Sequence, residues 1–304
     1  MIRDIKVNKN GENSKLGDFL IKSIPTLNLR DANRNLSFNK ILVNNETTSF
    51  DYVLKLNDII SLNISDKFFD IKIDTSFLKA KPEVDVIYED ENILVINKPS
   101  GLLSQADKNQ KINTIENRSR KYLFDKKQFT LNQYTTFIPT LCNRLDFNTS
   151  GLIIIAKNIL ALRIINEKLA NGEIKKYYLC NVKGKMLKSS DTISTYLHKD
   201  EKTNKVLIVK NKSKNSIQAI TKYKVLKANN SYSLLEVELV TGKSHQIRAH
   251  MQYIGHPIIG DKKYNSSKIK ANGQELTSYR IIFDFKSDAG ILNYLNKKEI
   301  VLER

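Results

Sequence analysis

The sequence predicts an α+β protein in which a mixed, mostly antiparallel sheet is flanked by helices and preceded by a small N-terminal α/β module. Strand-like apolar runs outnumber helix-like ones, and neighbouring runs are often separated only by a short turn. The length of 304 residues suits two domains. A polar, proline-containing segment at residues 77–83 separates two apolar-periodic stretches. We therefore expect a small module with its linker at residues 1–80 and a larger domain at residues 81–304.

The N-terminal module is predicted to contain two short helices followed by two strands. Apolar residues recur at the spacing of one helical face between Leu16 and Ile24, and a second helix is expected near Asp31. Residues 40–46 favour a strand that runs into a turn, and residues 58–64 favour a second strand.

The larger domain is predicted to begin with a hairpin. Residues 84–88 and 93–97 are β-branched runs separated by four polar residues. The elements expected beyond it are strands at 152–156, 177–182, 206–209, 219–225 and 234–240, and helices at 161–169 and 246–254.

The charge of the chain indicates a polyanionic partner. Lysine and arginine number 50 against 32 acidic residues, a formal net charge of +18, of which only +2 lies in residues 1–80. Basic side chains gain affinity for nucleic acid by releasing counterions from phosphates. The alternative is a compositional bias toward lysine, asparagine and isoleucine that has no bearing on function.

Several classes of protein are excluded by the apolar runs and the cysteines. The longest apolar runs, such as residues 152–156, span about five residues, whereas a membrane helix needs about 20. The first six residues are charged early and lack the apolar core of a signal peptide. Cys142 and Cys180 form no paired motif. We expect a cytoplasmic protein with no membrane partner.

The first of three polar segments that could carry chemistry is residues 143–152. It places the carboxylate of Asp146 directly before the most apolar predicted strand, beside Arg144, Thr149 and Ser150. A carboxylate that is hydrogen-bonded in its ionised form stays nucleophilic at neutral pH. The alternative is an aspartate that only organises a turn.

The second and third segments are residues 175–178 and 241–252. The second offers a tyrosine that could stack on a base or transfer a proton, although most such tyrosines only pack in a sheet. The third contains His245 and His250, followed by His256. Two histidines five residues apart lie about 140° apart on a helix, and no acidic or thiolate ligand is interleaved, so we expect no metal.

Taken together, these segments resemble the motifs of the RluA-type pseudouridine synthases, which isomerise uridine in ribosomal or transfer RNA. Members carry "his-arg-leu-asp-x-x-thr-ser-gly-leu", "lys-x-tyr-leu-ala" and "thr-gly-arg-x-his-gln-ile-arg-x-his". They also carry "asn-lys-pro-x-gly" before these and "gly-his-pro-x-x-gly-asp-x-x-tyr" after them. The corresponding segments of this chain are residues 143–152, 176–180, 241–250, 97–101 and 255–264.

The resemblance implies a role for each of three residues. Asp146 would be the nucleophile, Tyr178 the residue that stacks on the base and transfers a proton, and Arg248 the cation paired with Asp146. An arginine fork suits a carboxylate and keeps it ionised. The residues that the resemblance suggests for substrate contact are Arg144, Thr149, Ser150, Lys176, Lys243, His245 and Gln246.

This sequence departs from the family pattern at several positions. Asn143 replaces a histidine, Lys243 an arginine and Cys180 an alanine. The family's "leu-his-ala" near the C-terminus is replaced at residues 276–278 by leucine, threonine and serine. None of these changes touches the three residues to which the resemblance gives chemistry.

The order of elements in residues 1–80 resembles a small RNA-binding module first seen in a ribosomal small-subunit protein, the alpha-L motif. Arg30, Arg34 and Lys40 are its candidates for phosphate contact. The alternative is an accessory domain without RNA affinity, since a net charge of +2 is a weak electrostatic footprint.

The resemblance as a whole implies a monomeric RNA pseudouridine synthase that needs neither cofactor nor metal. Its implied substrate is large-subunit (23S) ribosomal RNA, with transfer RNA as an alternative. A second alternative is a non-catalytic RNA-binding or ribosome-assembly factor that retains the fold.

Overall fold

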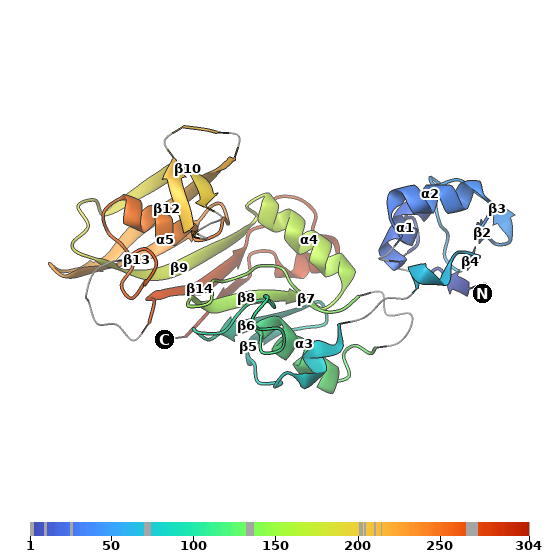
Figure 1. Ribbon diagram of the computed structural model, residues 1–304, viewed down its shortest axis with the longest axis horizontal. Helices are drawn as coiled ribbons and strands as arrows, with labels where there is room; N and C mark the ends of the chain where they lie inside the picture. Colours follow the sequence, from blue (N-terminus) through green and yellow to red (C-terminus); the bar gives the residue numbers. More distant parts are fainter. Residues whose placement is uncertain are drawn as a thin grey trace. The chain divides into compact units, whose positions relative to one another are not determined.

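The computed structural model describes residues 3–8, 11–24, 27–69, 74–131, 137–200, 203, 205–209, 211–213, 215–265 and 273–303. The chain divides into two compact units (Figure 1). One comprises Met1–Thr75 with Phe129–Phe137, and the other comprises Ser76–Gln128 with Ile138–Arg304.

The first unit packs two helices on a small sheet. Its elements are β1 (Arg3–Lys6), α1 (Leu16–Ser23), α2 (Leu29–Ser37), β2 (Ile41–Val43), β3 (Glu46–Thr47) and β4 (Ile59–Leu62), with a short 3₁₀ helix at Asp66–Phe68. The strands lie in the order β1-β4-β2-β3. Leu16, Leu20 and Ile60 are fully buried in its core.

Two features of this unit follow from its local sequence. Asn44 and Asn45 join β2 to β3 with φ of 52° and 68°, a left-handed conformation that asparagine tolerates better than most residues. The sequence did not predict β1, because its four residues include only one apolar side chain, Ile5.

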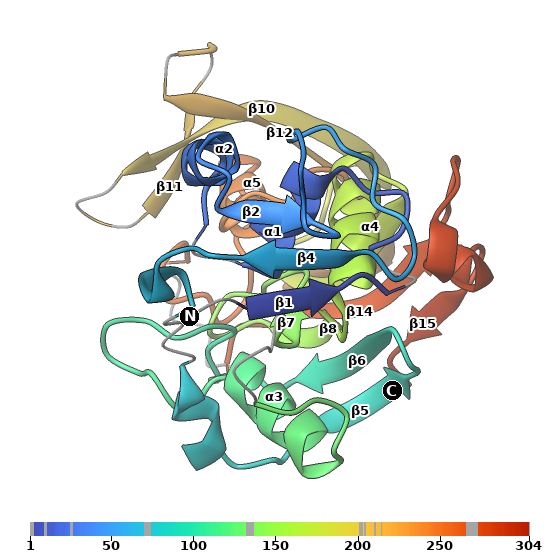
Figure 2. The ribbon, with the colours of Figure 1, turned by 90° about the vertical axis from the view of Figure 1, so that its right-hand side faces the viewer.

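The second unit is built on an eleven-stranded sheet, curved as Figure 2 shows. Its strands are β5 (Asp85–Glu89), β6 (Ile93–Lys98), β7 (Thr140–Leu141), β8 (Ser150–Ala156), β9 (Ile174–Lys183), β10 (Ser190–Asp200), β11 (Lys205–Val209), β12 (Ser216–Ala228), β13 (Tyr232–Leu239), β14 (Leu276–Phe283) and β15 (Glu299–Val301). The path through the sheet is β11-β10-β12-β13-β9-β14-β8-β6-β5, with β15 beside β14 and β7 beside β8.

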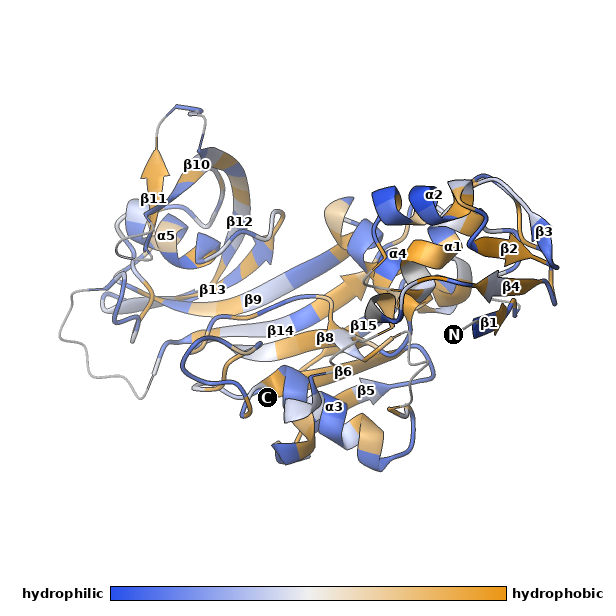
Figure 3. Cartoon of the chain, turned by 45° about the vertical axis from the view of Figure 1, so that its right-hand side comes forward, coloured by the Kyte–Doolittle hydropathy of each residue, from blue (hydrophilic) through white to orange (hydrophobic). Residues whose placement is uncertain are grey.

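This sheet confirms the predicted α+β class and its mostly antiparallel character. Among the described residues, β8 and β14 form its one parallel pair. These two strands approach closely where they meet, since a Cβ atom on Gly151, whose φ is +115°, would lie 2.1 Å from the carbonyl oxygen of Ser278. Strands β6 and β8 carry long apolar stretches (Figure 3) and form the centre of the core.

Within the described residues, three α-helices accompany this sheet: α3 (Ile115–Asp125), α4 (Ile159–Ala170) and α5 (Gln246–Tyr253). Helix α4 packs against β8 and β9, and α5 packs against β11 and β12. Short 3₁₀ helices lie at Thr75–Lys79 and Gly290–Leu295. Phe77, within the polar segment that the sequence marked as a boundary, is fully buried and meets the ring of Phe124 edge-on at 5.8 Å.

Several elements of this unit were not predicted from the sequence, among them α3, β10 and β14. Helix α3 buries more polar than apolar residues, with Glu116, Asn117 and Ser119 against Ile115 and Leu123, and so lacks a clear apolar stripe. Strand β10 is rich in serine and threonine, and only Ile193 and Leu197 are buried in it. For strand β14 the sequence offered only a weak match to a family motif at residues 276–278, and this match did not predict a strand.

Candidate active site

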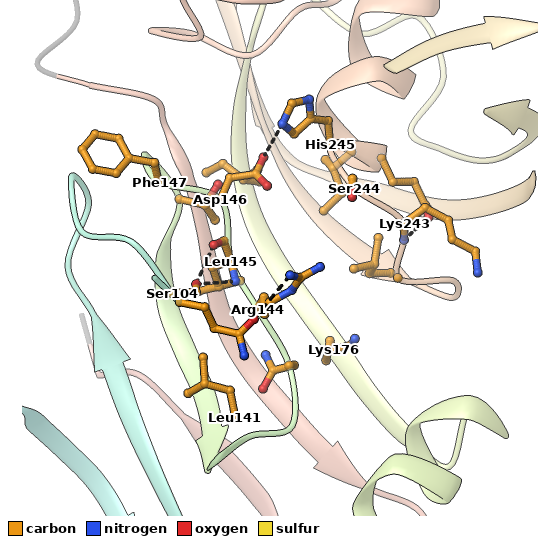
Figure 4. Close-up of a pocket in the computed structure, with 18 of the residues that line it drawn as sticks. Ser104, Leu141, Arg144, Leu145, Asp146, Phe147, Lys176, Lys243, Ser244 and His245 are labelled. Atoms are coloured by element: carbon orange, nitrogen blue, oxygen red, sulfur yellow. Dashed lines mark hydrogen bonds and ion pairs between the residues drawn. The ribbon is translucent and has the colours of Figure 1, made fainter. Parts of the chain in front are cut away.

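A cavity of about 880 Å³ lies in the second unit. Segments far apart in the sequence line it: residues 103–107, 141–147 and 242–248, with Thr149, Lys176, Tyr178 and Leu276 among the others. Figure 4 shows side chains entering it from the loop before β8, from β9 and from the start of α5. The three polar segments noted in the sequence therefore meet in one place.

The loop that carries Asp146 is held from behind by residues 98–104. The Ser104 hydroxyl donates to the carbonyl of Leu145 at 2.6 Å and accepts its backbone N–H at 3.0 Å. The Lys98 ammonium donates to the carbonyl of Phe147 at 3.2 Å, and the N–H of Gly101 reaches the same oxygen at 2.9 Å. Backbone on both sides of Asp146 is thus fixed, which fixes the carboxylate.

Arg248, on the first turn of α5, joins Asp146 to a second carboxylate. Its Nη1 donates to Asp146 Oδ2 at 2.7 Å, while Nε and Nη2 donate to Asp261 at 2.7 and 2.9 Å. Burial alone would lower the pKa of Arg248, but the two carboxylates outweigh it and raise the pKa above its ordinary value. The exposed side-chain fractions are 28% for Asp146, 8% for Arg248 and 0% for Asp261. Asp146 is therefore the carboxylate of this cluster that a ligand can reach.

His245 begins α5 in a left-handed conformation with φ of 51°. Its Nε2 lies 3.9 Å from Asp146 Oδ2, and the two side chains point toward each other in Figure 4. Its Nδ1 lies 3.0 Å from the hydroxyl of Tyr264, whose ring also lies under the Arg248 guanidinium at 5.0 Å. The pKa of His245 is lowered by burial and by the charge of Arg248, against the attraction of Asp146.

Strand β9 contributes Lys176 and Tyr178 to the cavity. Tyr178 is 5% exposed, and its burial raises the pKa of the phenol well above its ordinary value. Burial likewise lowers the pKa of Lys176. Tyr178 therefore keeps its proton at neutral pH.

The other residues predicted for substrate contact fall into three groups. Arg144 and Lys243 line the cavity with exposed side chains. Gln246 and Thr149 also line it but are buried and hydrogen-bonded within the protein: the Gln246 amide bonds to Thr221 and three other partners, and Thr149 accepts from Gln274 at 2.8 Å. Ser150 does not line the cavity, and its hydroxyl lies 2.8 Å from that of Thr277.

The candidates in the N-terminal module, Arg30, Arg34 and Lys40, belong to the first unit, and all three are exposed. The Arg34 guanidinium lies 6.0 Å from the ring of Phe38, which is itself 64% exposed. Helix α2 and its end thus present cations beside an exposed aromatic ring.

Four residues of the site were not singled out from the sequence: Lys98, Ser104, Asp261 and Tyr264. Three of them, Lys98, Asp261 and Tyr264, lie inside the motifs "asn-lys-pro-x-gly" and "gly-asp-x-x-tyr". The motifs therefore marked these positions, but did not indicate what each side chain does. Ser104 lies outside every motif, and only its contacts with Leu145 show what it does.

The remaining histidines of the third segment are engaged elsewhere. His250 is fully buried with a ring nitrogen 2.9 Å from each of the hydroxyls of Thr195 and Thr221, and burial lowers its pKa to about 4. His256 bonds to the carbonyl of Lys183. Within the described ranges, no three His, Cys, Asp or Glu side chains are grouped to hold a metal ion. None of the helices seen there is long and apolar enough to cross a membrane.

The chain is similar to known proteins of one family. Residues 92–253 match the family model described as RNA pseudouridylate synthase. An uncharacterized RNA pseudouridine synthase of Mycoplasma capricolum is 32% identical over 314 residues, which cover 97% of this chain and 95% of that protein. The ribosomal large subunit pseudouridine synthase D of Borreliella burgdorferi is 34% identical over 203 residues, which cover 66% of this chain and 60% of that protein.

A solved structure is similar in fold. Human RNA pseudouridylate synthase domain containing 4 superposes with a TM-score of 0.58 at 21% identity, covering 72% of this chain and 88% of that one.

Proposed function

Because this chain belongs to the RNA pseudouridine synthase family, we propose that it isomerises specific uridines of large-subunit (23S) ribosomal RNA to pseudouridine. The observation that supports this most is the pair formed by Asp146 and Arg248 at a cavity of about 880 Å³. Such a volume falls in the range of about 300–1,000 Å³ that small-molecule sites have, and it leaves room for a nucleoside turned out of its stack.

Asp146 is the proposed nucleophile. Turning uridine into pseudouridine breaks the bond between ring nitrogen 1 and the ribose and forms one between ring carbon 5 and the ribose. A carboxylate can hold the ribose or the ring covalently while the base turns. Arg248 keeps this carboxylate ionised and aimed at the cavity, because its planar fork is bonded to Asp261 on the other side. No electron is gained or lost overall, so the proposed reaction needs no cofactor.

Tyr178, which lines the cavity, is proposed to stack on the flipped base. Its ring offers an aromatic face for stacking. Because burial raises the pKa of its phenol, the hydroxyl would donate a hydrogen bond rather than take up a proton. We therefore expect a residue of the cavity other than Tyr178 to accept the proton that leaves carbon 5.

One observation favours ribosomal RNA of the large subunit as the substrate, and two others favour an RNA substrate in general. One relative, from Borreliella burgdorferi, is named for that substrate. The net charge of +16 beyond residue 80 suits phosphate contacts, to which Arg144, Lys176 and Lys243 would contribute inside the cavity. The first unit, with Arg30, Arg34 and Lys40, is proposed as the alpha-L-like RNA-binding module of residues 1–80. We expect the protein to act as a monomer in the cytoplasm.

A map of pseudouridines in total RNA, made with and without the gene, tests this proposal. We expect particular sites in 23S RNA to be lost and then restored by a wild-type copy, but not by an Asp146→Asn copy. Loss from transfer RNA instead would move the substrate to the transfer-RNA alternative. An unchanged map, together with purified protein that forms no pseudouridine on ribosomal or transfer RNA, would favour a factor that only binds RNA.

A further inference from the structure

The proton on His245 can be located from the hydrogen bonds of its neighbour Tyr264. A tyrosine hydroxyl has one proton to donate. In Tyr264 that proton goes to the carbonyl oxygen of Val206 at 3.2 Å, while the hydroxyl oxygen accepts the N–H of Val206 at 2.8 Å. The Nδ1 of His245 lies 3.0 Å from the same hydroxyl, and all three contacts of Tyr264 are hydrogen bonds at once when Nδ1 is the donor. The neutral imidazole then carries its proton on Nδ1 and a free electron pair on Nε2.

In this tautomer the unprotonated nitrogen, Nε2, faces the carboxylate of Asp146. Nε2 lies 3.9 Å from Asp146 Oδ2, and Figure 4 shows both side chains at the same cavity. The His245 side chain is 16% exposed, so the cavity is where Nε2 meets a ligand. A substrate atom held by Asp146 would lie within reach of Nε2, since both groups approach it from the same side.

The surroundings keep the imidazole neutral. The charged groups that act on it are Asp146 and Asp261, which favour a cation, and Arg248 and Lys263, which oppose one, while the phenol of Tyr264 packs edge-on at 5.7 Å. Burial and the two cations lower the pKa of His245 below its ordinary value of about 6.5. An acceptor must be unprotonated to work, and His245 meets that condition at neutral pH where the buried phenol of Tyr178 does not.

We propose that Nε2 of His245 is the base that accepts the proton leaving carbon 5 of the uracil ring. This inference rests on the proposed function. Once the new carbon–carbon bond has formed, carbon 5 carries both its hydrogen and the ribose. The proton passes to Nε2, and the electrons of the C–H bond form the double bond between carbons 5 and 6. The electrons of the former double bond between carbon 6 and nitrogen 1 move to nitrogen 1, which takes up a proton, so the imidazolium can return to neutral with no net change.

His245→Asn is the variant that removes Nε2 with least disturbance. Asparagine tolerates φ of 51°, and its amide can replace Nδ1–H as the donor to Tyr264. We expect kcat to fall about 10²-fold or more, as for loss of a general base, with little change in RNA affinity. We also expect a larger isotope effect when the target uridine carries deuterium at carbon 5, because proton removal becomes the slow step.

His245→Gly keeps the left-handed backbone and leaves an imidazole-sized gap. Imidazole added to the buffer should restore turnover of this variant in proportion to its unprotonated fraction, and should not restore Asp146→Asn. His198→Asn is the matched control, since His198 is partly exposed and outside the cavity lining, and its kcat should not change.

The outcomes separate this inference from the proposed function. A wild-type protein that forms no pseudouridine on any RNA would overturn both. Wild-type turnover combined with an unchanged isotope effect in His245→Asn and no rescue of His245→Gly would overturn the role of His245 alone. That result would leave His245 as a structural residue at the start of α5.

Discussion

Arg248 and Asp261 face each other through two hydrogen bonds, from Nε to Oδ2 at 2.7 Å and from Nη2 to Oδ1 at 2.9 Å. Asp261 also accepts the backbone N–H groups of Lys263 and Tyr264 at 2.9 and 3.1 Å. Burial alone would raise the pKa of Asp261, but the bonds from Arg248 lower it. The side of the guanidinium that faces away from the cavity is thereby locked, and Nη1 is left to Asp146.

Replacing Asp261 should therefore damage both the fold and the site. In Asp261→Asn, Arg248 loses a fully buried counter-charge, and breaking such a pair costs about 3–5 kcal/mol. Urea unfolding measures this loss, and turnover under saturating RNA should fall in the same variant. Glu238→Gln is the control, because its contact with Lys222 is 3.7 Å long and half-exposed, and such pairs contribute about 0–1 kcal/mol. Equal unfolding midpoints for the two variants would contradict this account.

Asp146→Asn should abolish pseudouridine formation and leave RNA affinity nearly unchanged. An amide cannot act as the nucleophile, whereas Arg248 keeps its bonds to Asp261 and the cavity keeps its shape. Mass spectrometry of the RNA product and a binding titration measure the two effects. A variant with near-normal turnover would refute the assignment of Asp146.

Lys98→Met should destabilise the loop that carries Asp146. The fully buried ammonium donates to the carbonyls of Pro99, Leu102 and Phe147 at 2.9, 2.8 and 3.2 Å. Each buried carbonyl left without a partner costs about 1–3 kcal/mol; the Phe147 carbonyl keeps the N–H of Gly101, so the loss falls on the carbonyls of Pro99 and Leu102. Turnover should fall as well, since the backbone next to Asp146 is released. Lys81→Met, at an exposed position, should change stability by less than about 0.5 kcal/mol.

The same lysine gives the stability a specific pH dependence. Burial lowers the pKa of Lys98 to about 8, while the unfolded chain retains a value of about 10.4. Between these values the unfolded state binds more protons, so this group makes stability rise with pH from about 8 to about 10.4. Urea midpoints across that window should rise for the wild type relative to Lys98→Met. A constant difference between the two would show that Lys98 does not titrate in this range.

Glu89 should contribute to acid unfolding. Burial alone would raise its pKa, but bonds from Lys126, Gln128, Tyr122 and Lys157 lower it from 4.5 to about 2. A depressed carboxyl pKa stabilises the fold above the unfolded value, and this stability is lost as pH falls from about 4.5 to about 2. Thermal midpoints of Glu89→Gln should therefore be lower than wild type at pH 7, with the gap closing toward pH 2. A gap that does not depend on pH would contradict this.

Deleting residues 1–75 should weaken RNA binding more than it slows the saturated reaction. The cavity residues all lie beyond residue 80, whereas Arg30, Arg34 and Lys40 are removed. The measurement is KM and kcat for the full and shortened chains on the same RNA. An unaltered affinity would identify the first unit as an accessory without a part in RNA binding.

The sequence predicted the family and the α+β fold, and both are confirmed. It did so because the motifs are local: residues 143–152 and 241–250 each carry several side chains of the cavity in one short segment. Hairpin strands such as β5 and β6 were likewise visible, since their apolar runs are separated by a short turn.

The sequence could not predict the contacts that hold the site residues in place. Ser104 and Leu145 are 41 residues apart, and no local pattern indicates that a hydroxyl will clamp a distant backbone. The proton position on His245 likewise depends on Val206 and Tyr264, which meet only in the folded chain. Ser150 stands beside Asp146 in the motif, yet the alternation of a strand turns its hydroxyl to Thr277.

The position of β14 has a consequence for synthesis of the protein. This strand follows β8 and β9 in the chain but lies between β8, which follows the Asp146 loop, and β9, which carries Tyr178. Until residues 276–283 leave the ribosome, β8 and β9 each present an unpaired edge to their missing neighbour. The two walls of the cavity are joined through the sheet only when that strand inserts. A nascent chain thus completes this cavity only after residues 276–283 have emerged, and cannot modify RNA before that point.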